Sequence, residues 1–232
     1  MKKLLLLIVM LCNAQFASAE IVEVYRWKAF PGKGAELLAA AQEAASIHTT
    51  MGASVQINQL DIGTTQNMDY VLRYDDLSSW GRVKDTNATS VDYAAFITLF
   101  AENPPGELVE SIFATNTDNT TMANDFSDVS AYSVFIWDPV PGGSAGLTEG
   151  FAAAKMIHES LGARVETYIE TYGGTDKMHY VMLFDSWAHM AEVTTAMSTD
   201  ETWLAFNAAS LDAIEPTAIL VQSFAGSVLA NF

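Results

Sequence analysis

The chain has 232 residues, half of them apolar, with 28 acidic and 11 basic side chains, a formal net charge of −17 at pH 7. This charge excludes nucleic acid as a ready partner, because phosphate backbones are bound by clusters of lysine and arginine. The composition is typical of a soluble protein with an ample core. The acidic surface favours neutral or cationic apolar ligands over polyanions.

The N-terminal residues predict export. Lys2 and Lys3 precede an apolar run over 4–11 that is too short to span a bilayer, and a small-residue cleavage signature ends at Ala19. We therefore expect 1–19 to be a bacterial signal peptide and the mature protein to be periplasmic or secreted, with no membrane attachment. Cleavage removes Cys12, the only cysteine, which excludes disulfides and thiol chemistry from the mature chain.

The rest of the chain contains one pattern twice, at a constant offset of 110 residues. Trp27, Pro31, Gly32, His48, Gly52 and Tyr70 recur as Trp137, Pro141, Gly142, His158, Gly162 and Tyr180. A fixed offset over nearly a domain length indicates a duplicated folding unit. We expect a first repeat over 20–115, a linker rich in turn formers over 116–130, and a second repeat over 131–232.

Each repeat is predicted to run strand, helix, strand, strand, helix, strand. In the first repeat these elements are expected at 21–29, 35–51, 53–62, 68–75, 78–102 with a polar break at 85–90, and 107–115. The second-repeat strands are expected at 132–138, 163–172, 178–185 and 218–224. Asp75 and Asp185 follow the third strands and are expected to cap the second helices.

A β-α-β-β-α-β unit folds as an antiparallel sheet with both helices on one face. The other face is too apolar here for water, so we expect the two sheets to pack on each other. The predicted fold class is α+β, with two ferredoxin-like β-α-β-β-α-β repeats whose antiparallel sheets pack into one intramolecular dimeric α/β barrel. The sequence leaves open whether this pseudo-dimer is monomeric or assembles into homo-oligomers.

The strand, Pro-Gly turn, helix ending in glycine and two further strands, repeated as Pro31-Gly32 to Gly52 and Pro141-Gly142 to Gly162, resemble the dimeric α/β-barrel superfamily. That superfamily includes NIPSNAP-like and EthD-like proteins, antibiotic-biosynthesis monooxygenases, haem-degrading monooxygenases and chlorite dismutases. The resemblance covers both repeats. It implies a small-molecule pocket between a sheet and its helices or in the barrel lumen, often used for cofactor-independent chemistry on apolar or aromatic ligands.

Comparison with these relatives also bears on cofactors. The haem-binding members hold iron with a histidine on the second helix, and 80–102 contains none, so no haem or other cofactor is expected. The monooxygenases typically use a Trp/Asn/Arg constellation, and Trp27, Asn58 and Arg73 supply those residue types without a matched motif.

Strand alternation predicts which side chains share a face. If the β-branched positions sit under the helices, the aromatic positions face the space between the sheets. The candidate ligand-binding residues are Tyr25, Trp27, Asn58, Tyr70, Arg73, Tyr74, Trp137, Glu166, Tyr168 and Tyr180. An apolar cavity with a few polar groups is the usual form of a ligand site, and the alternative is that these rings simply fill a barrel core.

His48 and His158 are the candidate catalytic residues, because a histidine titrates near neutral pH and acts as acid or base. The alternative is structural: both lie in the last turn of a predicted helix, where a histidine interacts with the negative helix end. His179, His189 and Asp185 match no metal signature, so no metal site is predicted.

Three functions stay open on the sequence. The first is an exported protein that binds a small apolar or aromatic ligand. The second is a cofactor-independent monooxygenase or isomerase acting on such a molecule, and the third is a non-catalytic assembly module. Function is expected where the copies differ, as at Arg26 against Ile136 and Arg73 against Leu183.

Overall fold

A computed structural model describes residues 19–64, 67–173, 176–211 and 215–232, so the predicted signal peptide lies, except for Ala19, outside the described residues. The first repeat contains β1 (Ile21–Ala29), α2 (Gly34–Thr50), β2 (Ser54–Ile62), β3 (Asn67–Tyr74), α3 (Leu77–Thr89), α4 (Val91–Glu102) and β4 (Gly106–Asn116). The second contains β5 (Ala131–Pro139), α5 (Ser144–Ser160), β6 (Arg164–Tyr172), β7 (Met178–Phe184), α6 (Trp187–Met197), α7 (Glu201–Leu211) and β8 (Ala218–Asn231). None of the described helices is long and apolar enough to cross a membrane.

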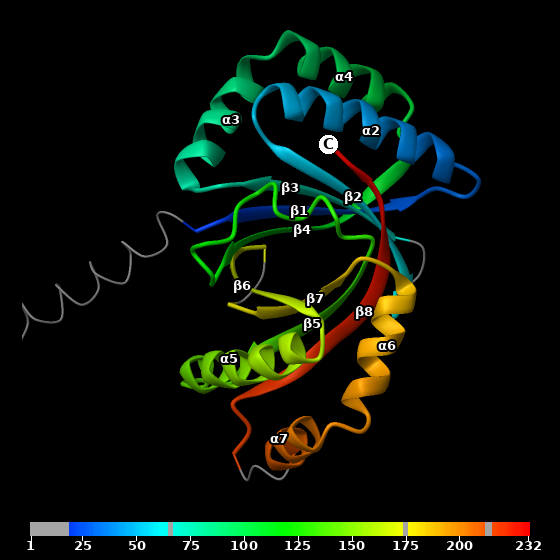
Figure 1. Cartoon of the computed structure of the whole chain (residues 1–232). Coiled ribbons are helices and arrows are strands. Elements are labelled where there is room, and N and C mark those ends of the chain that lie inside the picture. The colour runs from blue at the N-terminus through cyan, green and yellow to red at the C-terminus, as the bar shows by residue number, and fades with distance from the viewer. Residues whose placement is uncertain (1–18, 65–66, 174–175, 212–214) are drawn as a thin grey trace, which may run out of the picture.

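The eight strands form one closed antiparallel barrel in the order β1-β3-β2-β8-β5-β7-β6-β4. The predicted fold class of two ferredoxin-like repeats in an intramolecular barrel is confirmed. The repeats are joined at both sheet edges, where the end of β4 pairs with β6 and the end of β8 pairs with β2. Strand β8 is therefore longer than predicted: its second half leaves its own repeat and runs up to the other, as the red strand in Figure 1 shows.

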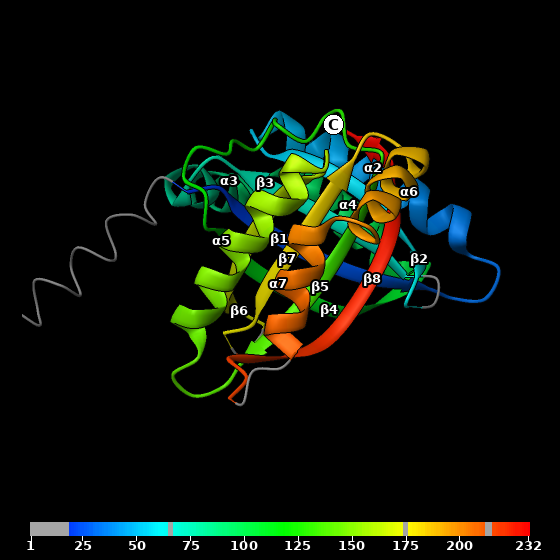
Figure 2. The ribbon, with the colours of Figure 1, turned by 60° about the horizontal axis from the view of Figure 1, so that its bottom comes forward.

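The helices cover the outside of the barrel. Figures 1 and 2 show α2, α3 and α4 over the first repeat's sheet and α5, α6 and α7 over the second's. The second helix is divided in two, but the break is shorter than the predicted 85–90: α3 continues to Thr89, and Ser90 ends it and caps α4. The predicted caps at Asp75 and Asp185 are wrong by one residue: Asp76 caps α3, and Ser186 caps α6.

The two faces of each sheet are reversed relative to the prediction, which placed the β-branched positions under the helices and the aromatic positions between the sheets. The aromatic positions of β1 and β3 pack under the helices, where Tyr70 and Tyr74 share a core with Leu37 and Ala41 of α2. The β-branched positions, such as Val22 and Val71, line the lumen instead. Small alanines on α2 leave room that only large rings can occupy, whereas the narrow lumen suits short branched side chains.

The segment predicted as a linker packs on the barrel. Phe126 and Val129 are buried in a cluster with the lumen-lining residues Tyr132 and Val134. The ring of Phe126 lies 3.6 Å from Cζ of Arg73, a cation–π contact between the connection and the first repeat. The connection therefore takes part in the core and stabilises the contact of the two repeats.

Candidate functional site: a cavity between the first sheet and its helices

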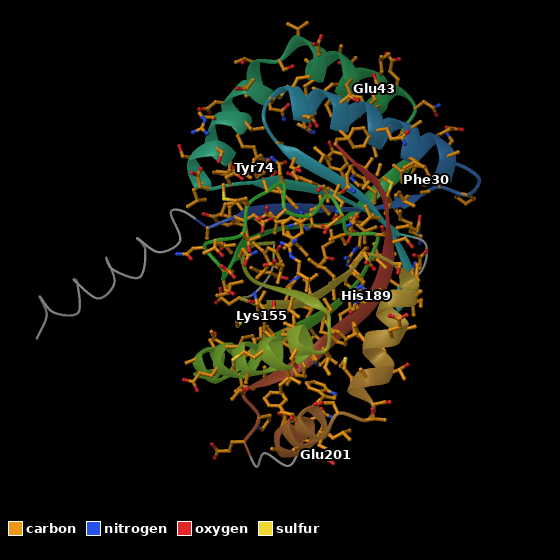
Figure 3. The ribbon with its side chains drawn as sticks, viewed as in Figure 1. Phe30, Glu43, Tyr74, Lys155, His189 and Glu201 are labelled. Carbon is orange, nitrogen blue, oxygen red and sulfur yellow. The ribbon has the colours of Figure 1, made fainter. Side chains whose placement is uncertain are left out.

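A cavity of about 250 Å³ lies in the first repeat between the sheet and helices α2, α3 and α4. Tyr25 and Trp27 of β1 and Tyr70 and Tyr74 of β3 line its floor, and Tyr93 of α4 is among the residues that line its helical side. Figure 3 labels Tyr74 in this upper half of the molecule. The lining is mostly aromatic and aliphatic with a few polar groups, the usual composition of a small-molecule site.

His48 presents a neutral imidazole to this cavity. Its Nδ1 lies 2.7 Å from the hydroxyl of Tyr70, and its ring is 5.2 Å from that of Tyr93. Burial, aided by the charge of Lys84, lowers the pKa of His48 to about 4, so the ring is uncharged at neutral pH. The other ring nitrogen, Nε2, has no hydrogen-bond partner among the described residues. The ring therefore bonds a tyrosine of the sheet rather than the carbonyls of the helix end.

Glu23 organises the polar side of the site. Its carboxylate accepts hydrogen bonds from Nε1 of Trp80 at 2.9 Å and Nζ of Lys84 at 2.8 Å, and from Tyr74 at 3.3 Å. Glu23 is only 6 % exposed. Burial of this carboxylate is tolerated because several donors surround it.

The second repeat keeps the histidine and tyrosine but fills the space. Its His158 Nδ1 lies 2.8 Å from the hydroxyl of Tyr180, and burial lowers the pKa of His158 to about 4. Phe151 stands where the first repeat has Ala41, with its ring 5.1 Å from that of Tyr180. Trp203 replaces Tyr93 and lies 4.2 Å from the ring of His158, whose Nε2 is buried without a partner among the described residues.

The polar groups of the first site are also missing from the second repeat. At the offset of 110, Glu23, Tyr25, Tyr74 and Lys84 are replaced by Ser133, Phe135, Phe184 and Thr194. Among the described residues, the polar groups that border the cavity thus occur in the first repeat and are absent from the second.

A second, smaller cavity of about 80 Å³ lies in the barrel lumen. Arg26 makes two hydrogen bonds to Asp69, at 2.8 and 2.9 Å, and Arg73 bonds Glu20 at 2.6 Å and Tyr168 of the other repeat at 3.0 Å. Burial, opposed mainly by the charge of Arg73, raises the pKa of Glu20. Both arginines are paired with carboxylates of the first repeat, and Arg73 also bonds Tyr168 of the second, which links the two sheets.

The predicted site residues divide among three places. Tyr25, Trp27, His48, Tyr70 and Tyr74 meet at the first-repeat cavity. Trp137, His158 and Tyr180 occupy the equivalent, filled space of the second repeat. Asn58, Arg73 and Tyr168 line the lumen, and Glu166 is buried beside them with Asn116 and Arg164.

The structure also bears on the expected monooxygenase-type constellation and on the histidines considered as metal ligands. Trp27 lies on the helix face of the sheet and Asn58 and Arg73 on the lumen face, so the monooxygenase-type constellation does not assemble. His179 bonds Glu170, and Nδ1 of His189 lies 2.9 Å from a carboxylate oxygen of Asp185. Within the described ranges, no group of three or more histidine and acidic side chains is placed to hold a metal ion.

Sequence reasoning missed several residues of the cavity. Lys84, Asn87 and Tyr93, which line it, and Glu23 and Trp80, which support its polar side, resemble ordinary surface or helix residues when read one at a time. The available signal was the comparison of the repeats, since each of these residues changes type at the offset of 110.

Comparison with solved structures supports the architecture. A protein from Fusobacterium nucleatum, provisionally named a monooxygenase, superposes with a TM-score of 0.65 at 11 % identity, over 92 % of this chain and 94 % of the other. An anthrone oxidase-like protein gives 0.59 at 12 % identity, over 94 % of each chain, and a provisionally named chlorite dismutase gives 0.56 at 9 %, over 91 % and 95 %. This chain has the fold of the dimeric α/β-barrel superfamily. At these identities the likeness establishes the fold alone.

No protein-family model matches this dimeric α/β-barrel chain, and no curated protein matches it. A haem held by a histidine of the second helix does not fit the residues present, because α3 and α4 contain no histidine and His189, at the start of α6, lies beside Asp185. The equivalent space under α6 and α7 is occupied by Phe151 and Trp203.

Proposed function

We propose that this protein is exported and binds one small apolar or aromatic molecule in the sheet–helix cavity of its first repeat. The observation that carries the proposal is the asymmetry of the repeats: the first has a cavity of about 250 Å³, and the second fills the same place with Phe151 and Trp203. Both repeats keep the barrel closed, so an open space is not needed for the fold. A cavity lined by aromatic side chains stabilises an apolar ligand by removing its surface from water.

Native mass spectrometry of the protein purified from the periplasm tests this proposal. We expect a co-purifying molecule at one per chain, released by denaturation, and a polypeptide mass that begins at Glu20. A chain that arrives bare should still bind naphthalene-2-carboxamide, a neutral two-ring molecule, at one per chain. A bare chain that also fails to bind this molecule would overturn the binding function, and a mass that includes residues 1–19 would overturn export.

A second candidate function is a cofactor-independent monooxygenase or isomerase, favoured by the position of His48. When Nδ1 carries the ring proton and donates to Tyr70, Nε2 is a neutral acceptor at the cavity that can take a proton from an acidic substrate. The pKa of about 4 makes His48 a weak base, so it suits a substrate whose proton is itself acidic. Two of the structural neighbours carry monooxygenase or oxidase-like names.

Oxygen uptake with anthrone checks this second function. Anthrone is chosen because its methylene group is acidic and its oxidation to the quinone consumes one O₂, releasing water. We expect His48→Gln to lower the rate by ~100-fold or more, the usual effect of removing a general base. The matched variant His158→Gln changes the filled repeat and should leave the rate unchanged. Equal rates for both variants, or no uptake by the unaltered protein, would leave only the binding function.

A further inference from the structure

We propose that the ligand of the first-repeat cavity is an apolar carboxylate, and that Lys84 selects it. This inference rests on the proposed binding function and adds the chemical class of the ligand. It is carried by the placement of one charged side chain among apolar ones. Lys84 lines the cavity, whereas its counter-ion Glu23 is buried, accepts hydrogen bonds from Tyr25 and Tyr74, and does not line the cavity.

Lys84 has two protein partners for the three protons of its ammonium group. The two oxygens of Glu23 lie 2.7 and 2.8 Å from Nζ, and the hydroxyl of Tyr25 lies 3.3 Å away. Within the described residues no third side chain accepts from this ammonium, so a ligand carboxylate would share it with Glu23 and Tyr25. The side chain of Lys84 is 36 % exposed, so a ligand in the cavity can reach it.

Glu23 does not depend on Lys84 alone. Trp80 and Tyr74 also donate to its carboxylate. The ammonium of Lys84 can therefore shift toward a second acceptor without leaving Glu23 with no hydrogen-bond donor. A ligand carboxylate that accepts from Lys84 forms a charge-assisted hydrogen bond next to apolar walls, where screening by water is weak.

Asn87 supplies a second unsatisfied group, one turn further along α3. It also lines the cavity, and its Oδ1 is buried without a partner among the described residues. The amide can rotate by half a turn, which exchanges its oxygen for its NH₂ group. The NH₂ group in that position would donate to the same ligand carboxylate that Lys84 binds.

The polar groups are not required by the fold. The second repeat has Thr194 and Met197 at the positions of Lys84 and Asn87, and its sheet and helices form in the same way. They occur only in the repeat that has the cavity, which favours a role in binding over a role in packing. The net charge of −17 by itself favours neutral or cationic ligands, so a preference for a carboxylate isolates the local effect of Lys84.

Three molecules of the same size test the inference: naphthalene-2-carboxylate, naphthalene-2-carboxamide and 2-naphthylmethylammonium. We expect the carboxylate to bind the unaltered protein ~10-fold or more tightly than the carboxamide, measured by calorimetry at neutral pH, and the ammonium to bind most weakly. Lys84→Met should remove the preference for the carboxylate, so that the Kd values of the carboxylate and the carboxamide become equal within about twofold.

Two matched variants separate local from overall charge. Lys155→Met removes the same charge from α5 in the other repeat, labelled just above that helix in Figure 3, and should leave the preference intact. Glu23→Gln removes the counter-ion and keeps an acceptor for Trp80, so the carboxylate should bind more tightly. Glu23→Gln serves as the deciding variant if Lys84→Met does not fold.

The outcomes distinguish this inference from the binding function. If the carboxamide binds as tightly as the carboxylate, or if the preference survives in Lys84→Met, the carboxylate assignment is overturned and the binding function stands. Unchanged carboxylate affinity in Glu23→Gln would count against it in the same way. If none of the three molecules binds, both proposals are overturned.

Discussion

Replacing Ala41 with phenylalanine is expected to abolish ligand binding without unfolding the protein. Ala41 lines the first-repeat cavity, and the equivalent residue of the second repeat, Phe151, fills the same place. A ring added at position 41 should lie against Tyr70 as Phe151 lies against Tyr180. We expect the affinity for naphthalene-2-carboxamide to fall by ~100-fold or more. The added apolar contact should raise the free energy of unfolding by about 1–2 kcal/mol.

Calorimetric titration and urea unfolding of the same sample check both halves of this result. Ala39→Phe is the matched control, because Ala39 is exposed on the same helix and a ring there points to solvent. It should bind the ligand as the unaltered protein does. Normal binding by Ala41→Phe would show that the ligand lies elsewhere, and the lumen cavity would become the next candidate.

The reciprocal change, Phe151→Ala, should create a site where none is open now. Removing a buried phenylalanine costs about 3–5 kcal/mol of stability, because a cavity remains. That cavity would lie beside His158 and Tyr180, the same pair that the first repeat presents to its ligand. A neutral apolar ligand should restore part of the stability in proportion to its concentration, and the binding stoichiometry should rise from one to two per chain.

The sequence was sufficient to predict the fold because residues that end a helix or form a turn are present in both repeats. Gly52 and Gly162 adopt φ of +99° and +104° just after their helices, a conformation that favours glycine and ends the helix in both copies. The length of β8 was not predictable in the same way. Its second half is stabilised by pairing with β2 of the other repeat, and nothing local in 225–231 reports that partner.

The assignment of faces shows the limit of strand periodicity. Alternation separates Tyr70 and Tyr74 from Val71 and Arg73 but does not say which set faces the helices. That choice depends on non-local facts. Ala41 of α2 leaves room for rings, and Arg73 in the lumen needs Glu20 and Tyr168 as partners from distant positions. The reversed assignment followed from reading the sheet without these partners.

The candidate site was predictable in part for a similar reason. His48 and Tyr70 were both selected from the repeat, but their hydrogen bond joins a helix end to a strand and has no signal in either segment. Lys84 resembles a solvated helix residue, and Glu23 an ordinary strand residue. What marks both is their absence from the second repeat, as Thr194 and Ser133 show, which is information about function rather than fold.

Acid is expected to destabilise the protein chiefly through His48 and His158. The pKa of each falls from about 6.5 in the unfolded chain to about 4 in the folded protein because the rings are buried. Between these values the unfolded chain binds the proton and the folded protein does not. The stabilisation from each neutral histidine is therefore complete above pH 6.5 and lost as the pH falls toward 4. Each contributes about 3 kcal/mol over this range.

Urea unfolding between pH 7.5 and pH 4 measures this loss directly. His48→Gln and His158→Gln keep a group that can bond the tyrosine hydroxyl but do not titrate, so each variant should lose about half of the pH dependence. A pH dependence that is unchanged in both variants would show that other groups cause the acid sensitivity. Asp76 and Asp118 are not those groups. Hydrogen bonds with Ser79 and Thr120, respectively, lower the pKa of each carboxyl, so both titrate below pH 4 in the folded protein.

Glu20 acts with the opposite sign in the same measurement. Its burial raises the pKa of the carboxyl above 4.5, so the folded protein takes up a proton before the unfolded chain does, and stability rises as the pH falls through that value. Glu20→Gln removes this compensation, and we expect the loss of stability on going to pH 4 to become larger in that variant. A smaller loss would mean that the ion pair with Arg73 outweighs burial and lowers the pKa of Glu20, so that this carboxyl removes stability as the pH falls instead of adding it.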